Sequence, residues 1–253
     1  MRCHIVNLTR SLGPTAAALL ISYGLAAPAL AADILFVSDS TTDSISIPAV
    51  LTGDGHNVTV VTNDFASGNL VLQGSLSAYG AVFWSATGPG YGSNHSAAVT
   101  SNLEAYVIAG GCVFVTGYDS ISSPDDVVLR TFIGAGANYD GRRALGPVIN
   151  VENSLSVGVV DIRGVTPTGA YGDQDTAQSL FAGTVGVVAS GGDGWVWTLR
   201  TLGGGEIAYV SNGAPAPSGS GETPSWLNTS PGGAGAYNAA LRNFASSCGG
   251  ASG

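Results

Sequence analysis

The stretch AVFWSATGPGYGSNHSAAVTSNLEAYVIAGGCVFVTGYDS, residues 81–120, decides the fold of this chain. It begins with an apolar run typical of a buried strand and continues through a glycine-rich loop. Residues 96–108 then carry apolar side chains at helical spacing, and a glycine pair ends this predicted helix. A second apolar run at 112–116 leads into a sharp turn. Strand, helix and strand in this order predict a parallel α/β unit.

The segments on either side extend this pattern to the rest of the chain. Helical spacing predicts helices at 44–51 and 236–246, and Ser123, followed by a proline and two acids, predicts another helix start. We expect residues 134–175 to form an irregular insertion. Further apolar or β-branched runs predict strands at 34–38, 57–62, 184–189, 195–201 and 206–211. The predicted fold is a three-layer, flavodoxin-like α/β domain whose sheet is mainly parallel, with an antiparallel C-terminal hairpin.

Residues 1–32 have the order of a secretory signal peptide. Arg2 and Arg10 precede an apolar run that ends in APALAA, which predicts cleavage after Ala31 or Ala32. The apolar run is broken by polar residues and is short for a membrane span. We therefore expect a secreted protein, periplasmic or extracellular, with a single domain at 33–253.

The charge balance argues against nucleic-acid and membrane partners. The sequence has no lysine, and loss of the leader leaves six arginines against seventeen acidic residues, a formal charge of −11. Such a surface repels phosphate backbones and anionic lipids. Charged residues are only 10% of the chain, while small polar residues are plentiful. This composition suits an extracellular setting. The candidate partner is a small neutral ligand or a carbohydrate, and the sequence leaves the oligomeric state open.

The cysteines predict one disulfide. Cys3 leaves with the leader, so the mature chain keeps only Cys112 and Cys248. In an oxidising compartment such a pair forms a bridge, which here would join the last helix to the sheet. The alternative is a catalytic thiol at Cys112, but this residue precedes its strand instead of following it.

Three sequence blocks resemble the class I glutamine amidotransferase-like superfamily, in particular its secreted, trehalose-utilisation-like members. These blocks are LSAYG leading into AVFWSATG (76–88), LEAYVIAGG with CVFVTGYDS (103–120), and GEIAYVSNG (205–213). The resemblance implies that superfamily's α/β fold. It also implies a catalytic cysteine at the turn after residue 116 and a histidine after a later strand.

Neither catalytic residue stands where the resemblance requires it. The turn aligns on Tyr118 or Asp119, and the histidines of the mature chain, His56 and His95, both lie upstream of it. No cysteine occupies the matching position. We therefore expect an amidotransferase-like domain that is not an enzyme and that either binds a neutral ligand or acts as a surface interaction module.

Polar residues follow the predicted parallel strands and are the candidate ligand-binding residues. Because the carboxyl ends of parallel strands meet at one edge of a sheet, we expect these side chains to gather there. Asp39, His95 and Asp119 form the centre of this hypothesis, although each aspartate could instead cap a helix or turn and His95 could lie on the surface. The full set is Asp39, Ser40, Asn63, His95, Tyr118, Asp119 and Trp226.

A secreted hydrolase is the alternative to a binding protein. FVSDSTTDS is similar to the nucleophile block of SGNH-type esterases, with Ser40 in the serine position. The candidate catalytic residues would then be Ser40 or Asp119 with His95 as the base.

Two further features have competing interpretations. Asp173 and Asp175 are candidate calcium ligands, but they lack EF-hand spacing, and a capped turn before residues 176–181 is the preferred explanation. No other cofactor is expected. Trp195 and Trp197 share one face of a predicted strand, which is typical of core residues, whereas Trp226 lies in a predicted loop and is the better candidate for stacking on a sugar.

Overall fold

The computed structural model describes residues 31–39, 46–62, 75–86, 95–117, 120–121, 126–139, 148–167, 175–190, 194–211, 224–230, 233 and 235–248. Within these residues the strands are β1 (Asp33–Ser38), β2 (Asn57–Thr62), β3 (Ala81–Ser85), β4 (Cys112–Gly117), β5 (Ala135–Tyr139), β6 (Thr176–Leu180), β7 (Thr184–Ser190), β8 (Gly194–Leu202) and β9 (Gly205–Ser211). The helices are α1 (Ser46–Gly53), the 3-10 helix η2 (Leu76–Ala78), α2 (Ala97–Ile108), α3 (Val127–Phe132), α4 (Pro224–Leu227) and α5 (Gly235–Cys248).

All of these strands belong to one mixed sheet. Its order is β2-β1-β3-β4-β9-β8-β6-β5, and β7 pairs with β8 outside this path. The first five strands in this order, β2 to β9, are mutually parallel. β8 and β9 form an antiparallel hairpin. The predicted flavodoxin-like fold, mainly parallel with an antiparallel C-terminal hairpin, is confirmed.

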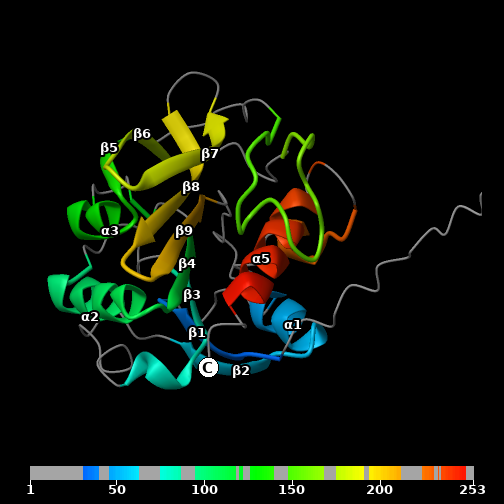
Figure 1. Cartoon of the computed structure of the whole chain (residues 1–253), viewed down its shortest axis with the longest axis horizontal. Helices are drawn as coiled ribbons and strands as arrows, with labels where there is room; N and C mark the ends of the chain where they lie inside the picture. Colours follow the sequence, from blue (N-terminus) through cyan, green and yellow to red (C-terminus); the bar gives the residue numbers. More distant parts are fainter. Residues whose placement is uncertain are drawn as a thin grey trace, which may run out of the picture.

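Helices cover both faces of the sheet because the strand residues alternate between two apolar cores. Ile34 and Phe36 point to one core, together with α1, α4 and α5, whereas Leu35 and Val37 point to the other, together with α2 and α3. Figure 1 shows these two helical layers on opposite sides of the strands. The central parallel strands are almost wholly buried, which agrees with their near-continuous apolar sequences.

The antiparallel half differs from the sequence-based prediction. Residues 134–175 were expected to be irregular, yet they contain β5, and β6 follows directly after them. Their sequences, AGANY and TAQSL, have few β-branched residues, so pairing with each other and with β8 holds them as strands. Residues 148–167 form turns and bends, as expected for the insertion.

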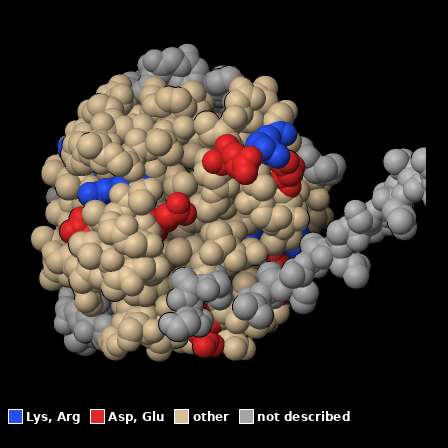
Figure 2. Space-filling model, in the orientation of Figure 1, with Lys and Arg blue, Asp and Glu red and all other residues tan. Residues whose placement is uncertain are grey.

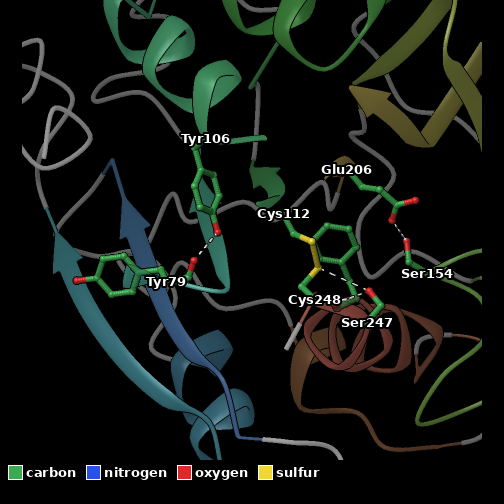
Figure 3. The surroundings of a disulfide bond; sticks show 8 residues. Tyr79, Tyr106, Cys112, Ser154, Glu206, Ser247 and Cys248 are labelled. Atoms are coloured by element: carbon green, nitrogen blue, oxygen red, sulfur yellow. Dashed lines mark hydrogen bonds between the residues drawn. A yellow bond between two sulfur atoms is a disulfide. The ribbon is translucent and has the colours of Figure 1, made fainter. Parts of the chain in front are cut away.

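The predicted disulfide is present. Cys112 at the start of β4 is bonded to Cys248 at the end of α5, and their Cα atoms are 6.0 Å apart (Figure 3). The bridge therefore ties the last helix to the centre of the sheet. Among the described residues, no helix is long and apolar enough to cross a bilayer. The predicted signal peptide lies almost entirely outside the described residues.

Two glycine-rich turns pack directly against each other at the amino ends of the parallel strands. The turn between β8 and β9 lies on the end of α2, and the Gly204 amide donates to the carbonyl of Ile108 over 3.2 Å. A Cβ atom at Gly205 would collide with the carbonyl of Gly111 and lie 2.6 Å from that of Val107. Backbone contact at this distance explains why both turns need glycine.

Candidate functional site

The connections after β1, β3 and β4 leave the sheet side by side at its carboxyl edge. The Asp39 amide donates to the carbonyl of Ser85 over 3.1 Å, and the Ala86 amide donates to the carbonyl of Thr116 over 2.7 Å. After β1 the chain crosses to α1 on one face, and after β3 it crosses to α2 on the other. The edge beside Asp39 is therefore the topological switch point, where open α/β sheets commonly bind ligands.

His95 lies between two carboxylates at this edge. Its Nε2 atom is 2.8 Å from Oδ2 of Asp39, and its Nδ1 atom is 2.5 Å from Oδ2 of Asp126. His95, Asp39 and Asp126 are 6%, 0% and 2% exposed. We call these three residues the histidine clasp. It joins the connections that follow β1, β3 and β4.

Backbone groups fix the position of Asp126 within the clasp. Asp126 is the N-cap of α3, and its side chain accepts a hydrogen bond from the Leu129 amide over 2.8 Å. The same carboxylate accepts the His95 amide over 2.8 Å. The sequence pattern predicted a helix start at Ser123, whereas α3 begins at Val127 with Asp126 as its cap. The positive end of the helix dipole also stabilises the negative charge of an aspartate at the N-cap.

Trp84 holds the other carboxylate. Its Nε1 atom donates to Oδ1 of Asp39 over 2.9 Å, and its ring meets the His95 ring edge-on with centroids 4.9 Å apart. Trp84 is fully buried at the end of β3. Asp39 therefore receives donors from two rings, and its position is set by the sheet itself.

The clasp keeps His95 protonated. Burial alone lowers the pKa of His95, but hydrogen bonds and charge from Asp126 and Asp39 outweigh burial and raise this pKa to about 9. Burial raises the pKa of Asp126, but hydrogen bonds from His95 and from backbone amides, with the charge of His95, lower it overall. At neutral pH the group is thus an imidazolium that donates to two carboxylates.

In this arrangement His95 is not placed to act as a general base. A base must have a free lone pair aimed at the proton that it abstracts. Both ring nitrogens of His95 instead face carboxylates. In a serine triad one imidazole nitrogen faces an acid and the other faces the serine, whereas here Nε2 faces Asp39.

Of the predicted site residues, the structure places Asp39 and His95 in contact and buries Trp226 in the core. Asp39 and His95 meet as predicted, but His95 is buried, so the expectation of a surface histidine is wrong. Asp126 was missed as a site residue, although an aspartate directly before the apolar run VVLRTF is a capping signal. The candidates Ser40, Asn63, Tyr118 and Asp119 lie outside the described residues.

Trp226 is not a surface platform for a sugar. It is 1% exposed and lies in the core, with its ring 6.0 Å from those of Phe114 and Tyr237, centroid to centroid. The prediction failed because the short helix α4 packs this segment against α5. Burial on that scale leaves no face of the indole for a ligand.

Asp175 has a structural role in a second polar cluster. Its Oδ2 atom accepts the Ile121 amide over 2.7 Å and the Ser120 hydroxyl over 3.3 Å, and Ser120 also lies 3.1 Å from the Tyr209 hydroxyl. These bonds tie Asp175 to the segment after β4, far away in sequence, so the capped-turn interpretation of its own segment stays a prediction. Asp173, the other candidate calcium ligand, lies outside the described residues. Within the described ranges, no three acidic, histidine or cysteine residues are grouped as metal ligands would be.

Comparison with known proteins adds information on the fold. No family model matches the chain, and no curated protein matches its sequence. A solved structure from Parabacteroides merdae, described as a ThuA-like protein, matches with a TM-score of 0.54 over 87% of this chain and 91% of that one, at 12% identity. This chain has a ThuA-like fold. The resemblance to the class I glutamine amidotransferase-like superfamily therefore holds at the level of the fold.

Other solved structures match less closely. One from Thermoplasma acidophilum, described as part of a GMP synthase, has a TM-score of 0.45 at 10% identity over 85% of this chain and 93% of that one. The exo-β-1,4-mannosidase Op5Man5 from Opitutaceae bacterium strain TAV5 has a TM-score of 0.45 at 13% identity. That match covers 72% of this chain, which spans about a third of the enzyme's length, 31%.

Proposed function

We propose that this ThuA-like chain is an exported, noncatalytic domain that binds a neutral ligand of the carbohydrate class. One observation carries the noncatalytic part: both ring nitrogens of His95 are held by buried carboxylates. A histidine with a pKa of about 9 is protonated at neutral pH and accepts no proton from a nucleophile.

The hydrolase alternative is not favoured because it needs His95 as the base for Ser40 or Asp119. Breaking the clasp to free His95 would leave the buried carboxylates of Asp39 and Asp126 without the cation that offsets their charge, which typically costs several kcal/mol. His56 does not replace it. The Nδ1 atom of His56 accepts the Ala32 amide over 3.2 Å, next to the amino ends of β1 and β2 and therefore away from the carboxyl edge.

The described surface supports a neutral ligand. Figure 2 shows few charged side chains on the face in view, separated by broad uncharged areas. Two arginines are also paired with acids, so their charges are locally compensated: Arg163 with Glu152 and Asp161, and Arg242 with Asp54. Broad uncharged areas of this kind offer hydrogen bonds to a neutral ligand, while the chain's excess of acidic residues repels anions.

Export rests on the leader sequence together with the disulfide. The bond between Cys112 and Cys248 is of the kind that persists in oxidising compartments. Both features fit a periplasmic or extracellular protein.

The test measures turnover and binding on the same purified mature protein. We expect no hydrolysis of p-nitrophenyl acetate or glutamine above the buffer rate. We also expect binding of a neutral oligosaccharide from the panel maltotriose, cellotriose and mannotriose, and no binding of trigalacturonic acid. Ester turnover that disappears in Ser40→Ala or in His95→Gln would contradict the noncatalytic proposal, and failure of all three neutral sugars would contradict the ligand class.

A further inference from the structure

A groove of about 460 Å³ lies at the opposite edge of the sheet from the histidine clasp. It runs between η2 and α2, beside the amino ends of β3 and β4. Its volume falls in the range of about 300–1,000 Å³ that is usual for small-molecule sites. The described residues that line it include Ser75, Ser77, Tyr79, Asn102, Ala105 and Tyr106.

One wall of the groove is a single face of α2. Asn102, Ala105, Tyr106 and Ala109 are spaced at i, i+3, i+4 and i+7, so they share this face. The two alanines are exposed and leave the groove open where larger side chains would fill it. This face presents an amide, an aromatic ring and two methyl groups.

The floor of the groove is held rigidly by Tyr106. Its hydroxyl donates to the carbonyl of Tyr79 over 2.9 Å and also interacts with the backbone of Cys112, and burial raises the pKa of Tyr106 to about 12. Its ring lies so close to Gly111 that a Cβ there would overlap it. Cys112 is in turn bonded to Cys248, as Figure 3 shows beside the two tyrosines. A floor fixed in this way is preorganised for a ligand.

The lining chemistry identifies the class of ligand. None of the described lining residues is charged, so an ionic ligand would meet no counterion. The exposed Ser75 and Ser77 hydroxyls, 2.7 Å apart, and the Asn102 amide supply neutral hydrogen-bonding groups. Tyr79 and Tyr106 supply rings, which combine apolar contact area with a polar tip. A molecule that carries hydroxyls around an apolar ring face matches this combination.

We infer that this amino-edge groove is the binding site for a neutral saccharide. The inference rests on the proposed function and gives its ligand a place, at the edge opposite the predicted site. Saccharide rings lie against the tyrosine side of the groove, and sugar hydroxyls exchange hydrogen bonds with the serines and Asn102.

The test fills the groove without disturbing its floor. Ala105→Trp and Ala109→Trp each place an indole in the groove, and Ala97→Trp is the matched control. Ala97 is an exposed alanine of the same helix, eight residues from Ala105 and thus about 12 Å away along the axis. Binding of maltotriose, cellotriose and mannotriose is measured by calorimetry, and amide shifts are followed by NMR. Equal melting temperatures of the three variants establish that each is folded.

We expect the neutral sugar that binds to perturb amides between Asn102 and Gly111. Ala105→Trp and Ala109→Trp should weaken its binding about tenfold or more, and Ala97→Trp by less than about twofold. Tyr79→Ala should also weaken binding, while the backbone carbonyl that receives the Tyr106 hydroxyl stays in place. Full binding in both groove-filling variants would overturn the inference and leave the proposed function standing. No binding of any neutral sugar to the wild type would overturn both.

Discussion

The two edges of the parallel sheet have opposite characters. At the carboxyl edge, Asp39, His95 and Asp126 gather their charges in the interior and bond to one another. At the amino edge, the described groove carries no charged residue and is open to solvent along α2. One edge is cross-linked by an ionic cluster, and the other by a disulfide and the hydrogen bond from the partly buried Tyr106 hydroxyl to Tyr79.

Polar residues after parallel strands can therefore serve to bind strand connections to one another. Open α/β sheets commonly bind ligands at the carboxyl edge. In the part of this chain that the structure describes, the strongest polar groups of that edge satisfy each other and hold three connections together. The neutral groups of the amino edge keep hydrogen-bonding capacity for a partner.

The largest effect is expected at the amino edge, where Gly205→Ala should prevent stable folding. The new Cβ meets the backbone of α2 and its glycine pair, which cannot move aside as a side chain would. Gly53→Ala is the control, because nothing lies within 4 Å of a Cβ there, and it should change stability by less than about 1 kcal/mol. Urea unfolding of both variants checks this. A folded, equally stable Gly205→Ala would mean that the two turns are not in contact.

The next largest effect tests the carboxyl edge. His95→Gln leaves two buried carboxylates without their shared cation, and it should cost about 3–5 kcal/mol of unfolding free energy at pH 7. The double variant His95→Gln with Asp39→Asn removes one of those charges and should recover part of the loss. A loss below about 1 kcal/mol for the single variant would show that the clasp does not hold this edge.

A smaller effect is expected from pH alone. The folded-state pKa of His95 is raised from 6.5 to about 9, so its contribution is complete below pH 6.5, declines above it and is lost as the pH rises through about 9. The loss amounts to about 3 kcal/mol by the size of this pKa change. Asp126 has a lowered pKa and contributes the opposite dependence, which is lost in acid. Urea unfolding between pH 6 and 10 should show the decline in the wild type, and a parallel decline in His95→Gln would assign it to other groups.

The parallel half of the fold was predictable from sequence and the antiparallel half only in part. Strands such as ILFVS and CVFVT are buried on both faces, so their apolar runs identify them directly. β5 and β6 have no such signal because partners, and not their own residues, determine their strand conformation. Trp226 was misplaced for a related reason, since the packing of α4 on α5 buries it.

Two residues of the histidine clasp were predictable from the sequence because they follow predicted parallel strands. Asp39 and His95 follow parallel strands and therefore meet at one edge. Asp126 lies in the connection after β4, as His95 lies in the connection after β3, but as the N-cap of α3 it carries the sequence signal of a helix cap and was not selected as a site residue. The groove combines η2, one face of α2 and a distant glycine turn, and such a combination appears only once the turns are seen in contact.

The most direct test of the account is the protonation state of His95, measured by ¹⁵N NMR of the imidazole rings in the folded protein. We predict both His95 nitrogens protonated at pH 7, with titration near pH 9, while His56 in the same spectrum, whose pKa is lowered by burial, remains neutral. A neutral His95 at pH 7, with one unprotonated nitrogen, would contradict the account and restore this histidine as a candidate base.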